Sequence, residues 1–195
     1  MRKIVLVAVL VLMASGAQAV TLNVIGGQLV GASGVDVGGS LYNVEFSYGT
    51  CVGVFDGCPQ SSLAFSTSGD ALTAAQALLD QVFLDVEAGQ FDSNPTLIPG
   101  CESAADNCVV LIPWERSFPE SYHDLKVVVS INTNGLLPSY PDQVASTEPA
   151  APLVSMYSDT DSGTFARFSA VPEPTTALLV GVGLIGLAIK RRSHA

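Results

Sequence analysis

Apolar and polar residues alternate in the first part of the chain, in short runs that are separated by glycines. The runs are residues 22–25, 28–30 and 41–47. In the third run, Tyr42, Val44 and Phe46 fall on one side of an extended backbone and Glu45 falls on the other. The Gly38-Gly39 pair favours a tight turn between neighbouring strands. We therefore predict an N-terminal β-meander.

A helical period replaces this alternation over residues 70–88. Apolar side chains recur there at helical spacing: Leu72, Ala75, Leu79, Val82, Phe83 and Val86. Asp70 is expected to cap the start of the helix, and Gly89 is expected to end it. The pattern predicts one main helix whose apolar side packs on a sheet.

The remaining middle of the chain again favours strands. Residues 109–112 and 126–131 predict two of them, and the second run is nearly all apolar, which is typical of a central strand. Prolines predict a surface loop over 137–152, and residues 153–157 and 164–168 are expected to form a closing hairpin. Together these elements predict an α+β fold, a β-rich single domain with one main helix.

The N-terminus has a different pattern. Met1-Arg2-Lys3 precedes an apolar run over residues 4–13 and small residues that end in Ala17-Gln18-Ala19. This order is typical of a secretory signal peptide, which signal peptidase would cut between Ala19 and Val20. A permanent anchor is the alternative, but the run is shorter than the ~20 residues of a spanning helix. We therefore expect residues 1–19 to be a signal peptide.

The C-terminus has three parts in a fixed order. Val171-Pro172-Glu173-Pro174 precedes an apolar run over 175–189, and Lys190-Arg191-Arg192 follows it. The prolines disfavour helix and keep the junction extended, which is a shape that proteases bind. As a helix the run would be about 22 Å long, against roughly 30 Å for the hydrocarbon core. The positive-inside rule would keep the basic cluster in the cytoplasm and the rest of the chain outside.

This three-part end resembles the PEP-CTERM sorting signal, which the membrane protease exosortase reads in bacteria that make exopolysaccharide. The resemblance covers residues 171–195. It implies that Pro172, Glu173 and Pro174 form the recognition motif, and that the transmembrane sorting helix is removed during transfer to the cell surface or extracellular matrix. An ordinary C-terminal anchor is the alternative.

Between the two ends, residues 20–170 are long enough for one domain with its own core. This segment has three basic residues, Arg116, Lys126 and Arg167, and 17 acidic ones, so its formal charge is −14. Such a charge repels nucleic acid, which excludes nucleic-acid binding. It is typical of a solvated acidic surface, and it can also attract divalent cations.

Four cysteines in an exported chain predict two disulfides. We favour the local pairs, Cys51 with Cys58 and Cys101 with Cys108, because each closes a short loop. Crossed pairing stays open. A zinc site is disfavoured because the spacing is not C-x2-C and histidine is nearly absent.

Few residues suggest chemistry. Asp159 and Asp161, followed by Gly163, are weak calcium candidates, although aspartate and glycine are also ordinary turn residues. His123 is the only histidine between the two ends, and no nucleophile motif accompanies it. Trp114 is a conceivable sugar-stacking residue, but a core position is favoured.

These observations predict a non-enzymatic exported protein of the cell surface or extracellular matrix, with no cofactor. Its expected partners are signal peptidase, exosortase and, by the resemblance, exopolysaccharide, with membrane contact through the C-terminal helix before processing. An extracellular calcium- or carbohydrate-binding module is the alternative, and a secreted hydrolase that uses His123 is the third hypothesis.

Overall fold

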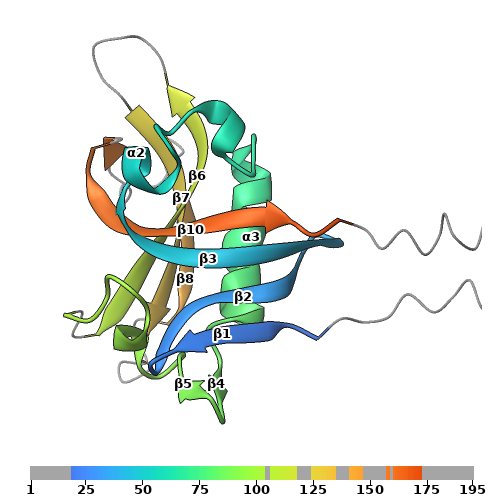
Figure 1. The fold of residues 1–195 in the computed structure, drawn as a ribbon, viewed down its shortest axis with the longest axis vertical. Coiled ribbons are helices and arrows are strands. Elements are labelled where there is room, and N and C mark those ends of the chain that lie inside the picture. Colours follow the sequence, from blue (N-terminus) through green and yellow to red (C-terminus); the bar gives the residue numbers. More distant parts are fainter. Residues whose placement is uncertain are drawn as a thin grey trace, which may run out of the picture.

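A computed structural model describes residues 19–103, 106–117, 124–134, 141–146, 157–158 and 160–172. Within these ranges one eight-stranded sheet organises the chain, in the order β1-β2-β3-β10-β6-β7-β8, and β9 also pairs with β7 (Figure 1). The strands are β1 Thr21–Ile25, β2 Gln28–Val37, β3 Ser40–Thr50, β6 Asn107–Ser117, β7 Asp124–Thr133, β8 Gln143–Ser146, β9 Tyr157–Ser158 and β10 Ser162–Ala170. All neighbours are antiparallel except β10 and β6, which are parallel. The α+β prediction is confirmed.

The N-terminal meander is also confirmed. Strands β1, β2 and β3 pair consecutively, and Val37 pairs with Ser40 across a two-residue turn. Gly38 and Gly39 have φ angles of 61° and 91° in that turn. A two-residue hairpin turn with positive φ at both positions matches the right-handed twist of the strands, and glycine adopts it without steric cost.

The main helix, α3, spans Ser68–Gln81, so both predicted ends were wrong. Thr67 is the N-cap, because its Oγ1 accepts a hydrogen bond from the Asp70 backbone N–H at 3.1 Å. Asp70 lies in the first turn, where its negative charge interacts favourably with the partial positive charge of the helix N-terminus.

The apolar period continues past Gln81 in the sequence, but residues 85–90 form a small hairpin of β4 Asp85–Val86 and β5 Gly89–Gln90. The Asp85 carboxylate accepts hydrogen bonds from the backbone N–H groups of Asp92 and Ser93, both at 3.1 Å. An aspartate that bonds to nearby backbone in this way competes with helix, which explains why the helix stops early.

One prediction for the second half is confirmed and two need correction. Strand β7 is internal to the sheet, with β6 on one side and β8 and β9 on the other, and its residues 127–130 are buried, as predicted for a central strand; β10 holds the middle position. Residues 143–146, inside the predicted loop, form β8, since this short piece has no proline and can pair with β7. The closing hairpin is also wrong, because β9 pairs with β7 while β10 lies between β3 and β6. Residues 153–156 are outside the described ranges.

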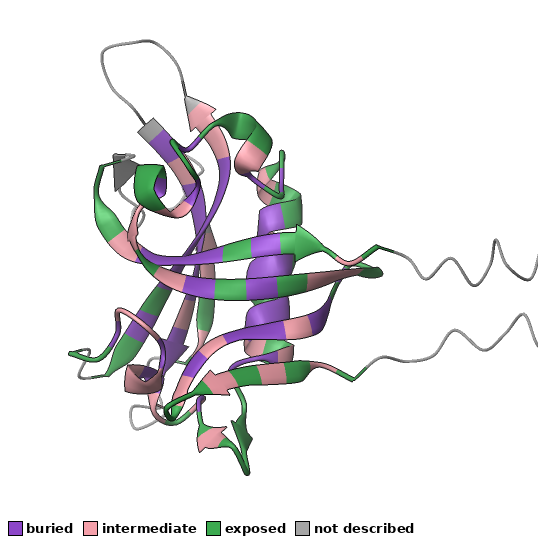
Figure 2. Cartoon of the chain, viewed as in Figure 1, coloured by how far each residue is buried: buried purple, intermediate pink, exposed green. Residues whose placement is uncertain are grey.

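The two sides of the sheet are covered differently. Helix α3 packs across one side, which we call the helix side, and Figure 2 shows buried positions along α3 and along the strands in front of it. On the opposite side, the outer face, the segment 51–63 folds back over part of the sheet. This segment contains α2 Cys51–Val54 and the 3-10 turn η1 Gln60–Ser62, and a second 3-10 turn, η2, spans Pro95–Leu97.

The folded-back segment encloses a second hydrophobic cluster, the outer core. Its buried members are Cys51, Phe55, Cys58, Leu63, Leu111, Leu125, Val127, Val129 and Phe165. Phe55 and Phe165 meet edge to face, with ring centroids 5.8 Å apart. Among the described residues, the outer core covers β6, β7 and the beginning of β10, and Ala145 of β8 packs against it. The outward side chains of Asn23, Asn43, Glu45, Arg167 and Ser169, on β1, β3 and the end of β10, are exposed in the described part of the chain.

Candidate functional site

The sorting end begins where the sheet ends. The Val171 backbone N–H donates to the Leu41 carbonyl oxygen at 2.9 Å, which prolongs the pairing of β10 with β3 by one residue. Pro172, the first residue of the predicted motif, follows directly and is exposed. Glu173 and Pro174 lie outside the described residues. The geometry therefore presents the start of the motif as an exposed segment that leaves a folded strand.

Both described ends of the chain lie at the same end of the sheet (Figure 1). Thr21, the first residue of β1, pairs with Ser33, and Ala170, the last residue of β10, pairs with Tyr42 next to the turn between β2 and β3. Ala19 is exposed and Val20 is partly buried, so the bond between them, where signal peptidase is predicted to cut, lies just before the sheet.

The part of the chain that the structure describes has no helix that is long and apolar enough to cross a membrane. The apolar run 175–189 is outside that part.

Both predicted disulfides are present. Cys51 bonds to Cys58 and Cys101 bonds to Cys108, with Cα atoms 5.4 Å and 5.5 Å apart. The first closes a loop within the segment 51–63, where both cysteines are buried in the outer core, and the second joins the segment before β6 to β6 itself. Within the described ranges no cysteine is free.

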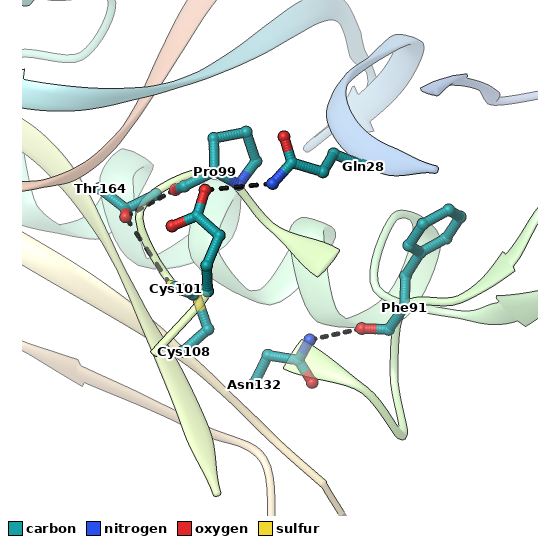
Figure 3. Close-up of a disulfide and its surroundings, with 8 residues drawn as sticks. Gln28, Phe91, Pro99, Cys101, Cys108, Asn132 and Thr164 are labelled. Atoms are coloured by element: carbon teal, nitrogen blue, oxygen red, sulfur yellow. Dashed lines mark hydrogen bonds between the residues drawn. A yellow bond between two sulfur atoms is a disulfide. The ribbon is translucent and has the colours of Figure 1, made fainter. Parts of the chain in front are cut away.

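The second disulfide also secures β10 (Figure 3). The Thr164 hydroxyl on β10 donates to the Pro99 carbonyl oxygen at 2.9 Å and lies 3.8 Å from the Cys101 sulfur. Gly100 has a φ of 84°, and a Cβ there would collide with Thr164 Oγ1 and the Tyr48 side chain. Glycine is therefore required for the close approach of this loop to the central strands.

An exposed carboxylate completes this loop. Gln28 Nε2 donates to Glu102 Oε1 at 3.1 Å. The backbone N–H groups of Glu102 and Gly100, followed by this amide, hold the pKa of Glu102 below its ordinary value. The contact joins the loop to the start of β2, and these donors favour the ionised form of Glu102.

Three aspartates gather near the small hairpin. The Ser93 backbone N–H, together with the Ser93 hydroxyl and the Asp92 backbone N–H, lowers the pKa of Asp85. Partial burial, then the charges of Asp142 and Asp85, raises the pKa of Asp92. Asp142 accepts from the Thr133 backbone N–H at 2.7 Å. The carboxylates of Asp85 and Asp142 therefore join neighbouring segments of the chain, whereas burial beside two like charges disfavours the ionised form of Asp92.

The structure describes only some of the residues that were predicted to bind metal or to take part in catalysis. Asp161 is exposed immediately before β10, and Asp159 lies outside the described residues. In the described ranges, no three histidine, cysteine, aspartate or glutamate side chains are grouped as metal ligands. His123 is also outside those ranges. Trp114 is buried in the helix-side core, with the Lys126 ammonium 5.1 Å from its ring, so the core interpretation is confirmed.

The open part of the outer face forms a groove that the sequence did not reveal. It has a volume of about 880 Å³ and lies over β1, β2, β3 and the end of β10. The polar residues that line it are Asn23, Ser33, Asn43, Glu45, Arg167 and Ser169. The alternation in residues 41–47 predicted that Glu45 faces away from the core, but the residues of β10 beside it are more than a hundred positions later in the chain.

Comparison with known protein families identifies the C-terminal segment. Residues 170–192 match the PEP-CTERM protein-sorting motif. No curated protein and no solved structure matches the chain. The match begins at the last residue of β10 and includes Pro172, Glu173 and Pro174, so the predicted resemblance is confirmed over this segment. The chain is thus an exported protein that is targeted to exosortase and processed at the membrane.

Proposed function

We propose that this exosortase-targeted protein acts without catalysis, as a component of the cell surface or extracellular matrix after its tail has been removed. The observation that carries the proposal is the sorting motif that follows β10 without an intervening linker. A folded domain directly before a removable tail is suited to release as a finished unit.

The chemical properties of the domain suit an extracellular environment. Its two disulfides are bonds of the kind that form and persist under oxidising conditions. A formal charge of −14 over residues 20–170 keeps the released domain soluble and repels anionic surfaces. The same segment contains one histidine, so a general base of that type is available at one position at most.

The spacing of the sorting end limits how exosortase can reach its motif. The sheet holds the chain up to Val171, and the apolar run starts at Thr175. Only residues 172–174 lie between them, which span about 10 Å when extended. Exosortase therefore works beside the folded end of the sheet, close to the membrane.

Intact mass tests the proposal on protein recovered from separated cell, matrix and medium fractions of the native host. We expect a chain that starts at Val20, lacks Lys190–Ala195 and gains four hydrogens on reduction, found in the matrix or cell-surface fraction. Substitution of Pro172, Glu173 and Pro174 by alanine should leave the tail in place, as should loss of exosortase. Pro59→Ala, at an exposed proline more than a hundred residues before the tail in the sequence, is the control and should be processed normally.

Two results would overturn the proposal. Wild-type protein that retains Lys190–Ala195 in its final location would mean that the tail is a stable anchor. Mature protein found only in the medium, free of cells and matrix, would contradict the proposed location.

A further inference from the structure

We propose that the groove on the outer face binds a neutral, hydroxyl-rich glycan chain. The inference deepens the proposed function, because it supplies the domain with a ligand class to hold in its extracellular location. It depends on the groove's shape, its charge and the chemistry of its side chains.

The groove is a regular arrangement of outward-facing side chains on four neighbouring strands. Asn43 and Glu45 of β3 lie directly opposite Ser169 and Arg167 of β10, and all four are exposed. Asn23 of β1 reaches Ser33 of β2, with 3.5 Å between its Nδ2 and the Ser33 Oγ. Polar groups therefore follow the groove from one side to the other, over an open length suited to a polymer rather than to an enclosed small molecule.

The charge of the groove distinguishes it from the rest of the acidic domain. Its lining contains one carboxylate, Glu45, and one guanidinium, Arg167, at opposed positions of two strands. The Asp56 carboxylate lies 3.8 Å from the Arg167 guanidinium, at the margin towards the segment 51–63. A polyanion would meet the field of a domain with a formal charge of −14, whereas a neutral ligand meets no such barrier.

The side chains fit hydroxyl groups better than they fit a peptide strand or an apolar partner. Asparagine amides and serine hydroxyls can each donate and accept hydrogen bonds, as sugar hydroxyls do. An extended peptide binds mainly through backbone hydrogen bonds at the edge of a sheet. At the floor of the groove, Val44 and Glu45 of β3 already have backbone partners in both β2 and β10. Val30 and the exposed Ile25 add apolar contact area of the kind that the C–H face of a sugar ring uses.

The test uses the exported protein purified from its host and the polysaccharide of the same culture, which anion exchange separates into neutral and acidic fractions. We expect the protein to bind the neutral fraction, and periodate, which cleaves vicinal diols, to abolish binding. The double variant Asn43→Ala/Ser169→Ala should weaken binding at least tenfold. Asn23→Ala/Ser33→Ala, on the other side of the groove, should also weaken it.

The matched control is Gln76→Ala/Asp80→Ala, which removes an exposed hydrogen-bonded pair from α3 and should bind like the wild type. Intact mass and circular dichroism check that every variant is folded and disulfide-bonded. No binding to the neutral fraction, binding that both groove variants retain, or binding that protease treatment of the fraction abolishes would each overturn the inference. The result is separate from tail removal, because a failure to bind leaves the processing measured by intact mass unchanged.

Discussion

The covered and open parts of the outer face differ most clearly on one strand. Phe165 and Arg167 are two residues apart on β10, and both point away from α3. Phe165 lies in the outer core beneath the segment 51–63 and has no exposed surface, whereas Arg167 lines the groove and is exposed. The difference comes from the covering segment, because the strand itself is continuous through both residues.

The covered region contributes stability, whereas the groove is the surface that is free to bind a ligand. Under the segment 51–63, apolar side chains are removed from water on both sides of the sheet, which is the condition for large hydrophobic stabilisation. Over the groove, the sheet is buried only on the helix side, so its outward side chains can be polar at little cost. The same sheet therefore has a stable end and an accessible end.

The largest expected effect comes from truncation of the covered residue. Phe165→Ala should lower the free energy of unfolding by about 3–5 kcal/mol, because it removes a fully buried ring and its edge-to-face contact with Phe55. Arg167→Ala is the matched control two residues away, and its effect should stay within about 0.5 kcal/mol. Urea unfolding of the two variants measures both values. Equal losses would mean that the groove is as important to stability as the outer core.

The next largest effect on stability is expected from loss of the disulfide within the covering segment 51–63. Cys51→Ala/Cys58→Ala should cost about 2–3 kcal/mol, from the loop entropy that the disulfide removes from the unfolded chain. Cys101→Ala/Cys108→Ala is a matched comparison, since both pairs have a sequence separation of 7. Urea unfolding should give similar losses, but hydrogen exchange in residues 51–63 should become faster only in the first variant. Faster exchange there in both variants would show that the two loops are not independent.

The sequence was sufficient to predict those features of the molecule that depend on residues close together in the chain. Alternation in 41–47 and the Gly38-Gly39 pair were sufficient to predict the meander, and cysteine spacing was sufficient to favour the right disulfides. These features depend on residues close together in the chain. The sorting motif is likewise a continuous segment, which explains why it was recognised without a structure.

The errors arose where distant residues decide the outcome. The central place of β10 depends on pairing with β3, more than a hundred residues earlier, and no local pattern indicates it. The groove was missed for the same reason. The helix was extended too far because the apolar period continues to Val86, while Asp85 bonds to backbone groups seven and eight residues later.

A smaller effect is expected from a buried hydroxyl on the helix side of the same covered strands. Ser130 of β7 is fully buried, and its Oγ has no hydrogen-bond partner in the part of the chain that the structure describes. Ser130→Ala should leave the free energy of unfolding unchanged or raise it by up to about 1 kcal/mol, because the desolvated hydroxyl is removed. Ser169→Ala, at a solvated hydroxyl of the groove, should change it by less than about 0.5 kcal/mol. A clear loss of stability in Ser130→Ala would mean that the Ser130 hydroxyl makes a stabilising hydrogen bond.

The smallest effects should come from the aspartates beside the covered strands, and they should have opposite signs. The pKa of Asp85 is lowered from 3.8 by its hydrogen bonds, so its ionised form stabilises the fold above the pKa of the unfolded chain, and this contribution is lost as the pH falls through the lower folded pKa. The pKa of Asp92 is raised by burial and by the charges of Asp142 and Asp85. Ionised Asp92 therefore destabilises the fold at neutral pH, and this cost disappears as the pH falls below 3.8.

Substitution by asparagine separates the two contributions. Asp85→Asn should lower the free energy of unfolding at pH 7, and Asp92→Asn should raise it, when each is measured against the wild type by urea unfolding. Both differences should shrink as the pH falls towards 3, because the wild-type carboxyl groups are then increasingly protonated in the folded and unfolded chains. Glu45→Gln in the groove is the comparison from the open part, where an exposed carboxylate should contribute little to the free energy of unfolding at pH 7. A loss of stability at pH 7 in Asp92→Asn would show that its charge takes part in holding the hairpin, as that of Asp85 does.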